Sequence, residues 1–337
     1  MIHDRQRSSK TGLMTLLRKI GLMSILILVT VVSVFLGGRP DYTNYMAAFI
    51  DKQNRLETTM PPRIVLIGGS NVAFGLDSEM ISESTNLPVV NLGLHAGLGL
   101  KFMVNSYKPY LRAGDIIIII PEYELFYGPY LNPDPGCLGA LLGVYPQARR
   151  YLDLSTMSLD DTVSMFVGIA QYKKNVIQSS ILKRISRRVE NTDQSLFVYS
   201  RDNFNEFGDE VKHLTAKPGT QPDTTSPIIE SLEISPKVIS FLNQFADYAH
   251  SRKANVYLDY PSRLEYNTSE EQSVGQLQQV LEEDLTFPII GIAADHLFPL
   301  EYFFDTNYHL NSGGRRINTE RLIDDILQRL SIGKQQA

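Results

Sequence analysis

Ser70, His309 and Asp305 are the residues whose types and spacing could support nucleophilic chemistry in this sequence. Ser70 directly follows an apolar run and two glycines, in RIVLIGGSN (63–71). His309 and Asp305 lie in DTNYHLNSGG (305–314), just before the last predicted helix. A serine hydroxyl needs a base to remove its proton, and the base needs an acid to fix its tautomer. The three residues together predict a site for acyl-ester chemistry.

Each residue of this set also has a simpler interpretation. A Gly-Gly-Ser turn after a strand could cradle a phosphate or only reverse the chain. His309 could cap a helix, and Asp305 could be a loop carboxylate. Among the 6 histidines, His95 is the rival base because it follows the second predicted strand. His296 and His213 are weaker rivals.

The elements that must position these residues alternate between strand and helix in both halves of the chain. Apolar, β-branched runs predict strands at 63–67, 88–92, 115–120, 255–260 and 287–292. Helical patterns lie at 77–85, 98–111, 236–252, 270–285 and 313–330. This alternation predicts an α/β fold with a central parallel sheet flanked by helices. Ligands in such sheets bind at the carboxyl ends of the strands, where Ser70 lies.

The alternation divides the chain into a core and an insertion. Residues 61–331 are expected to form the α/β domain, followed by a short tail at 332–337. Between about 128 and 227 the alternation is lost, and a helical pattern covers 159–188. We therefore expect a mainly helical insertion within the domain. Residues 39–60 are expected to be a linker with a short helix at 45–56.

The N-terminal region has the pattern of a single membrane anchor. Residues 20–38 carry no charged side chain and are numerous enough to cross a bilayer as a helix. Basic residues concentrate in 1–19, which predicts that this tail stays in the cytoplasm. A cleaved signal peptide is the alternative, but the apolar run is long and no Ala-x-Ala site closely follows it. The chain from about residue 40 is then expected to be periplasmic or extracellular.

Composition excludes several classes of function. The net charge of -5 argues against a nucleic-acid partner, which would favour a basic face. The chain has one cysteine, Cys137, so it cannot form an internal disulfide. No Cys/His spacing resembles a zinc site, and we expect neither a metal nor another cofactor.

Four segments together resemble the SGNH (GDSL-like) hydrolase superfamily, especially its membrane-anchored branch associated with acylation of cell-envelope polymers. They are IGGSN (67–71), NLGLHAG (91–97), DIIIIIPEYE (115–124) and DTNYHLNSGG (305–314). The resemblance implies a flavodoxin-like three-layer fold. It also implies Ser70 as nucleophile, His309 as base with Asp305 to orient it, and the amides of Ser70 and Gly93 as an oxyanion hole.

The chain departs from the family pattern in two places. The family's third segment usually carries Gly-x-Asn-Asp, whose asparagine completes the oxyanion hole, but this chain has PEYE (121–124). Because a carboxylate would repel an oxyanion, Glu122 and Glu124 are expected to point elsewhere or to serve another role. Asn71 is the alternative donor. The spacing from Asp305 to His309 is also one residue longer than the usual Asp-x-x-His, and Asn307 or a backbone carbonyl is the alternative partner for the ring.

The expected function is that of a membrane-anchored, extracytoplasmic serine esterase or O-acyltransferase. The resemblance implies an acylated envelope polysaccharide or a small ester as substrate, and a membrane acyltransferase as a possible partner. Hydrolysis and transfer share an acyl-enzyme, so these residues do not distinguish the two reactions. The alternative is a catalytically inactive assembly or polysaccharide-binding factor that retains the fold.

Overall fold

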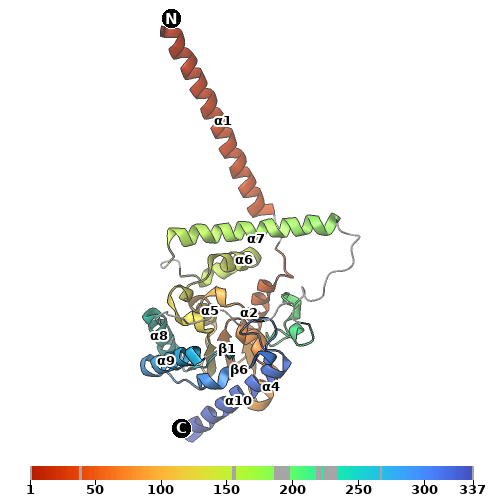
Figure 1. The fold of residues 1–337 in the computed structure, drawn as a ribbon, viewed down its shortest axis with the longest axis vertical. Coiled ribbons are helices and arrows are strands. Elements are labelled where there is room, and N and C mark those ends of the chain that lie inside the picture. The colour runs from red at the N-terminus through yellow and green to blue at the C-terminus, as the bar shows by residue number, and fades with distance from the viewer. Residues whose placement is uncertain are drawn as a thin grey trace.

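A computed structural model describes residues 2–37, 40–153, 157–185, 198–217, 222, 234–265 and 268–335. The helix α1 (Ile2–Gly37) projects away from the rest of the chain (Figure 1). A sheet with helices on both sides forms the body. The long helix α7 (Leu159–Ile185) and the shorter α6 (Pro135–Val144), both from the predicted insertion, lie between α1 and this body (Figure 1).

The body is built on four parallel strands in the order β2-β1-β3-β4. They are β1 (Arg63–Gly68), β2 (Val89–Asn91), β3 (Asp115–Ile120) and β4 (Asn255–Leu258). Every residue of β1, β2 and β3 is buried, which explains their unbroken apolar runs. The predicted α/β fold with a central parallel sheet is confirmed.

The prediction of a strand at 287–292 is wrong. That segment makes only an isolated parallel bridge, between Ile289 and Leu258 of β4. A second sheet, which the sequence did not indicate, pairs β5 (Arg263–Leu264) with β6 (Leu297–Phe298) in parallel. Two-residue strands are too short to carry a periodic pattern, so the sequence does not predict them.

Helices cover both faces of the sheet. On one face, alternate side chains such as Ile64 and Leu66 pack with α4 (Ser78–Thr85) and α10 (Ser312–Gln335). On the other, side chains such as Val65 pack in one cluster with helices that occupy the opposite layer. These are α2 (Ala48–Thr58), α5 (Leu100–Tyr107), α8 (Pro236–Ser251) and α9 (Thr268–Asp284). The helix α10 continues beyond the predicted domain end at residue 331.

A buried ion pair fixes β1 against β3 at the edge opposite the predicted site. Arg63 Nε donates to Asp115 Oδ1 at 2.8 Å, and both side chains are fully buried. The hydroxyl of Tyr107 and the backbone N of Arg112 also donate to Asp115. Because a buried charge without partners is costly, this network sets the register of the two strands that carry the site.

The described part of the predicted insertion contains α6 (Pro135–Val144) and α7 (Leu159–Ile185), which pack on each other. Figure 1 shows α7 lying across the base of α1. Residues 154–156, 186–197, 218–221 and 223–233 of this region lie outside the described residues, as do 1, 38–39 and 336–337. The remaining short helices are α3 (Ser70–Gly75), η1 (Tyr45–Ala47), η2 (Ala96–Leu98), η3 (Lys108–Tyr110), η4 (Tyr123–Phe126), η5 (Gly128–Leu131), η6 (Pro146–Tyr151), η9 (Arg201–Asn203), η10 (Lys212–Leu214), η11 (Ala293–His296) and η12 (Leu300–Tyr302).

Across the ranges that the structure describes, none of the helices combines the length and the apolar character needed to cross a bilayer. This finding does not support the transmembrane segment predicted for residues 20–38. Residues 20–37 of that segment belong to α1, and residue 38 lies outside the described residues.

Candidate functional site

Ser70 lies where the first strand gives way to a short helix. The strand β1 ends at Gly68, and Ser70 opens α3 with its side chain partly exposed. At Gly69 a Cβ atom would come within 2.6 Å of Glu122 Oε1 and 3.0 Å of the backbone N of Ala96. Only glycine allows this approach, which brings the segments after β1, β2 and β3 together around the serine.

This position is the topological switch point of the sheet. The chain leaves β1 for β2 on one side and then returns to β3 on the other. In open parallel sheets the crevice for ligands forms between the carboxyl ends of two such strands. Ser70 follows β1 and Glu122 follows β3, so the two residues face each other across that crevice.

Glu122 is in direct contact with the predicted nucleophile. Ser70 Oγ donates to Glu122 Oε1 at 3.1 Å, and the backbone N of Asn71 donates to the same oxygen at 3.2 Å. Of the two alternatives expected for Glu122, that it points elsewhere or serves another role, the first is therefore excluded. Glu124 does point elsewhere, because its Oε2 accepts a hydrogen bond from Tyr308 at 2.7 Å.

The surroundings of Glu122 favour its neutral form. Its side chain is buried, and burial together with the nearby Glu124 raises the pKa of Glu122 to about 7. The hydrogen bonds from Asn71 and Ser70 act in the opposite direction because they stabilise the carboxylate. The carboxyl group of Glu122 thus changes its charge near neutral pH.

Asp305 and His309 form the predicted acid–base pair. His309 Nδ1 lies 2.8 Å from Asp305 Oδ1, so the wider spacing of this chain still permits the contact. Both residues lie in the loop before α10, and His309 is buried. Because Asp305 engages Nδ1, Nε2 is the ring nitrogen that remains for a reacting group.

Tyr199 joins this pair from the predicted insertion. Its hydroxyl donates to Asp305 Oδ2 at 2.6 Å and lies 3.3 Å from His309 Nδ1. Burial acts to raise the pKa of Asp305, but the hydrogen bonds and charges of His309, with the bond from Tyr199, outweigh it and leave this pKa below its ordinary value. Asp305 is therefore held as a carboxylate beside the imidazole.

Phe74 brings His309 to the helix that carries Ser70. The imidazole of His309 stacks on the Phe74 ring with centroids 3.9 Å apart and planes 8° from parallel. Ser70 and Phe74 are four residues apart in α3, so they lie on the same side of that helix. The base candidate and the serine therefore belong to one neighbourhood, although Ser70 Oγ donates to Glu122 and makes no hydrogen bond to His309 among the described residues.

The predicted oxyanion-hole donors are already engaged. The backbone N of Gly93 donates to Asn91 Oδ1 at 2.9 Å. The side chain of Asn71 donates to the carbonyl of Ile120 at 3.0 Å, and its backbone N donates to Glu122. The amide of Asn71 is thus directed to the position beside Ser70 Oγ that Glu122 Oε1 now fills, whereas its side chain is directed elsewhere.

The rival histidines occupy different surroundings. His95 lies after β2, its Nδ1 accepts from the backbone N of Gly97, and its ring remains exposed. Desolvation by the surrounding protein and the nearby charge of His309 both lower the pKa of His95. His95 is thus also near the site and remains the alternative base.

His213 and His296 are fixed by buried structural contacts. His213 Nδ1 contacts Glu210, and its Nε2 lies 3.0 Å from the carbonyl of Leu310. His296 lies 3.2 Å from Asp259 and 3.1 Å from Asn318 Oδ1. With both ring nitrogens engaged in the interior, neither histidine is available to a substrate.

A cleft of about 610 Å³ opens at Glu122, the residue that accepts the hydrogen bond of Ser70 Oγ. Glu122 and Glu124 line it from the end of β3, Ala96 lines it from η2, and Tyr130 and Asp161 contribute from the insertion. The volume falls in the usual range for a ligand site. The described lining contains no Lys or Arg side chain, so the cleft favours neutral or cationic groups over anions.

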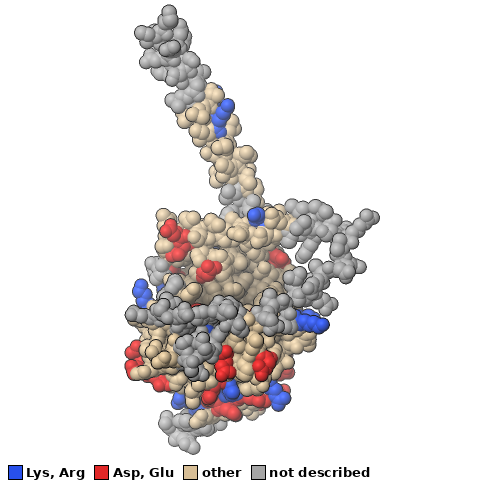
Figure 2. Space-filling model, in the orientation of Figure 1, with Lys and Arg blue, Asp and Glu red and all other residues tan. Residues whose placement is uncertain are grey.

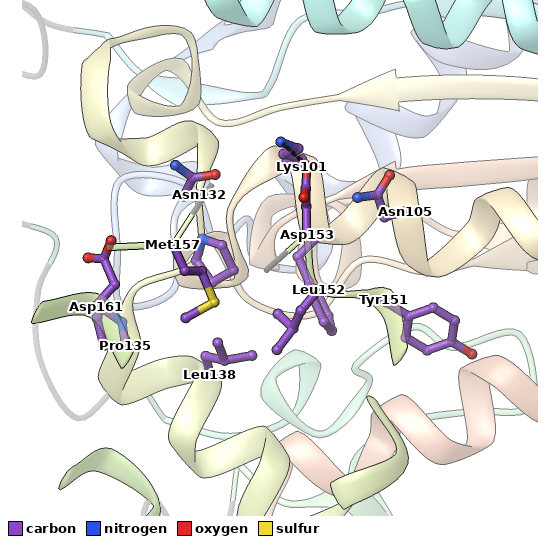
Figure 3. Close-up of a pocket in the computed structure, with 12 residues that line it drawn as sticks. Lys101, Asn105, Asn132, Pro135, Leu138, Tyr151, Leu152, Asp153, Met157 and Asp161 are labelled. Atoms are coloured by element: carbon purple, nitrogen blue, oxygen red, sulfur yellow. Dashed lines mark ion pairs between the residues drawn. The ribbon is translucent and has the colours of Figure 1, made fainter. Parts of the chain in front are cut away.

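The neighbouring pocket in Figure 3 is not a comparable site. Its cavity of about 30 Å³ has room for little more than water. The ion pair between Lys101 and Asp153, 2.7 Å long, crosses one side of it. The two pockets share Asn132 and Asp161, but of the two only the larger cleft is lined by Glu122, which accepts the hydrogen bond of Ser70 Oγ. We therefore assign ligand binding to the larger cleft.

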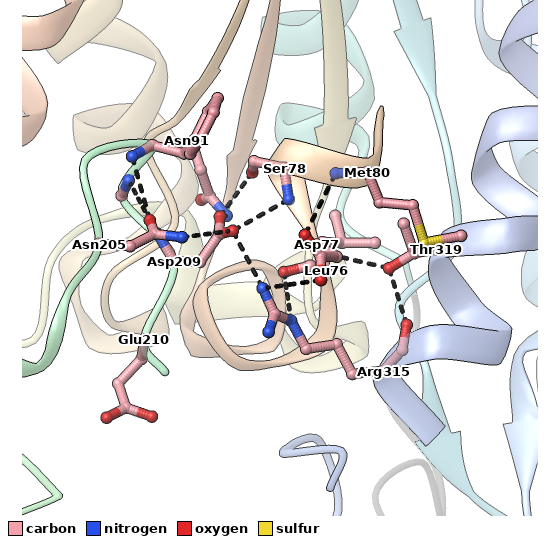
Figure 4. Close-up of polar contacts among 12 residues, drawn as sticks. Leu76, Asp77, Ser78, Met80, Asn91, Asn205, Asp209, Glu210, Arg315 and Thr319 are labelled. Carbon is pink, nitrogen blue, oxygen red and sulfur yellow. Dashed lines mark hydrogen bonds and ion pairs between the residues drawn. The ribbon is translucent and has the colours of Figure 1, made fainter. Parts of the chain in front are cut away.

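A polar network attaches the returning end of the insertion to the site-bearing elements (Figure 4). The fully buried Asp209 accepts hydrogen bonds from the backbone N of Ser78 at 2.9 Å, from Asn91 Nδ2 at 2.8 Å and from Arg315 at 3.1 Å. The backbone N of Glu210 donates to the carbonyl of Ala73 in α3. These contacts dock the segment that also carries Tyr199.

The sequence patterns did not predict the contact of Tyr199 with Asp305, the stacking of Phe74 on His309 or the contact of Glu122 with Ser70. Glu122 had a local signal, since it directly follows the third strand at the functional edge. Tyr199 and Phe74 had none, because their contacts join segments that are remote in sequence. In the ranges that the structure describes, no three His, Cys, Asp or Glu side chains gather in a way that could hold a metal ion.

Comparison of the chain with protein-family models, with curated proteins and with solved structures found no match.

Proposed function

We propose that this chain is a serine esterase or O-acyltransferase with Ser70 as nucleophile, His309 as base and Asp305 as the acid that orients the base. One observation carries the proposal: the Asp305–His309 pair stacks on Phe74, on the same side of α3 as Ser70. The motif resemblance to SGNH hydrolases supports the same assignment.

The mechanism follows from which atoms are engaged. Ser70 Oγ attacks the acyl carbonyl, and its proton passes to His309 Nε2 because Asp305 holds Nδ1. The tetrahedral intermediate then expels the alcohol, which takes that proton from His309. Water or an acceptor alcohol attacks the acyl-enzyme next, again with His309 as base, and Ser70 regains its proton. Water as acceptor gives hydrolysis, and a sugar hydroxyl gives transfer.

Ser70 must turn from Glu122 to His309 before this sequence can begin. The backbone N of Asn71 would then donate to the acyl oxygen in place of Glu122 Oε1. The cleft lined by Glu122 would hold the acyl group or its acceptor, and its uncharged and acidic lining favours a neutral sugar ester over an anionic one. An acylated envelope polysaccharide or a small ester fits this chemistry.

Attachment to a membrane through α1 is part of the proposal. Large apolar side chains from Ile20 to Val29 expose between 50% and 68% of their surface, on all sides of the helix. Figure 2 shows the described length of α1 as mostly uncharged apart from one basic patch. Such a surface is costly in water and favours lipid. The basic tail would remain in the cytoplasm and the body would be periplasmic or extracellular, where a membrane acyltransferase could supply acyl groups.

The contact between Glu122 and Ser70 favours a second candidate function. A carboxylate at the oxyanion position is compatible with a catalytically inactive assembly or polysaccharide-binding factor that keeps the fold. In that case Ser70 would serve only as a hydrogen-bond donor to Glu122.

Labelling with a fluorophosphonate, which reacts with activated serines, tests the proposal. The folded full-length chain in detergent is expected to take up the probe, and Ser70→Ala is expected to abolish labelling without changing the melting temperature appreciably. Ser84→Ala, at an exposed serine of α4, provides a matched serine substitution outside the site. Absence of labelling on the folded natural sequence across the neutral pH range would favour the inactive factor.

A further inference from the structure

The oxygen of Glu122 occupies the place that an acyl oxygen needs. Ser70 Oγ and the backbone N of Asn71 both donate to Glu122 Oε1. An acyl group attacked by Ser70 must put its carbonyl oxygen within reach of a donor beside the nucleophile, and Asn71 N is directed to that place. A bound substrate and the present position of Glu122 Oε1 therefore exclude each other.

The charge of Glu122 decides what this residue does to the reaction. As a carboxylate it accepts the hydrogen bond of the Ser70 hydroxyl, which directs this hydroxyl away from His309. A carboxylate at this place would also repel a developing oxyanion. As a neutral acid it carries an O–H group, and a small displacement lets this group donate to the acyl oxygen. A carboxylic acid kept neutral by its surroundings can serve as an oxyanion donor in this way.

We propose that Glu122 in its protonated form completes the oxyanion hole, and that its ionised form closes the site. This inference rests on the proposed function, since it concerns the same nucleophile. No proton is consumed: the Glu122 O–H donates to the oxygen that becomes negative, and the bond weakens again when the carbonyl re-forms. The proton removed from Ser70 still passes to His309 and then to the leaving alcohol.

The groups that face Glu122 support a neutral acid near pH 7. Glu124 lies on the same turn, and the hydroxyls of Tyr308 and Tyr45 lie within electrostatic reach from the loop before α10 and from η1. Asp134 and Asp161 line the same cleft from α6 and α7. None of these groups is a cation. Burial raises the pKa values of Glu124 and Tyr308 and the buried Arg263 acts to lower them, but Arg263 is not among the groups that shift the pKa of Glu122. Burial and Glu124 together raise the pKa of Glu122 to about 7.

The sign of the pH effect follows directly. Below the pKa of Glu122 the neutral acid can donate, and above it the carboxylate blocks the site. For one titrating group, activity falls tenfold for each pH unit above its pKa. The proposal therefore requires an alkaline decline that begins near neutral pH and belongs to Glu122.

The rate of fluorophosphonate labelling, measured against pH on the full-length chain in detergent, tests this inference. Glu122→Gln keeps the shape of the side chain and always offers an N–H donor, so its labelling should not decline at high pH. At about pH 9 it should react roughly 100-fold faster than the natural sequence. Glu122→Ala should also lose the decline but react more slowly than Glu122→Gln at every pH, because no donor replaces the acid.

Glu124→Gln is the matched control on the neighbouring carboxyl. It removes a negative charge beside Glu122, so the alkaline decline should remain and move to lower pH. If Glu122→Gln and the natural sequence decline together at high pH, the inference is overturned while Ser70 keeps its assigned role. If neither the natural sequence nor Glu122→Gln labels at any pH, although both are folded, the proposed function itself fails.

Discussion

At the scale of residues, the acid of the candidate site is held by a partner from its own loop and by a donor from a remote segment. His309 contacts one oxygen of Asp305, and Tyr199 donates to the other. A carboxylate with both oxygens engaged has a fixed direction, which in turn fixes the imidazole. The Phe74 ring stacks on the face of the His309 imidazole and restricts its rotation. The orientation of His309 thus depends on contacts that converge from α3, the insertion and the loop before α10.

Removal of one of these contacts should weaken the base without removing it. In Tyr199→Phe the ring remains but Asp305 loses a charge-assisted hydrogen bond, a contribution of about 1.5–3 kcal/mol. We expect the fluorophosphonate to react about tenfold more slowly, with the protein still folded and its melting temperature lowered by only a few degrees. Tyr42→Phe, at another exposed tyrosine, should react like the natural sequence. Equal rates for Tyr199→Phe and the natural sequence would show that Tyr199 does not position the base.

At the scale of elements, strong local patterns were predictable and tertiary contacts were not. The run DIIIII coincides with β3, and the alternation of strands and helices gave the parallel sheet. The apolar segment 287–292 also contains isoleucines, but it meets the sheet edge at a single bridge. It differs from DIIIII by Pro288 and Gly291, two residue types that interrupt strands.

The same distinction between local patterns and tertiary contacts applies to the candidate site. Ser70, His309 and Asp305 could be predicted because each follows or precedes an element with a clear pattern. The position of Glu122 could not, because proximity to Ser70 depends on how closely β1 and β3 approach at Gly69. The backbone amide of Gly93 was expected to bind the oxyanion, but it donates to the side-chain oxygen of Asn91. Such local bonds compete with ligand contacts and are decided by side-chain geometry.

The helix α1 is the element whose role is most open to a direct test. Exposed apolar side chains such as Leu22 and Leu26 should partition it into lipid. We expect the full-length chain to float with liposomes and to stay with them after washing at alkaline pH. Leu22→Lys together with Leu26→Lys should reduce this binding strongly, while Leu159→Lys on the exposed side of α7 serves as the control. A natural sequence that remains in the aqueous fraction would exclude an anchor.

At the scale of the whole molecule, the fold brings both ends of the body to one edge of the sheet. Ser70 follows the first strand, whereas His309 precedes the last helix. Arg315 at the start of α10 donates to the carbonyl of Leu76 and to Asp209, which joins α10, the end of α3 and the insertion (Figure 4). The cleft is lined by residues that follow β3, by η2 and by the predicted insertion, so the candidate site depends on segments from the whole body.

The most direct test asks whether Ser70 and His309 act as one unit. Hydrolysis of a small aryl ester should be measured for the natural sequence, Ser70→Ala, His309→Ala and the double variant. Residues that serve the same step are strongly non-additive, so the three variants should lose the same large factor in turnover. If the losses multiply in the double variant, or if His309→Ala retains full turnover, Ser70 and His309 do not form the nucleophile–base pair.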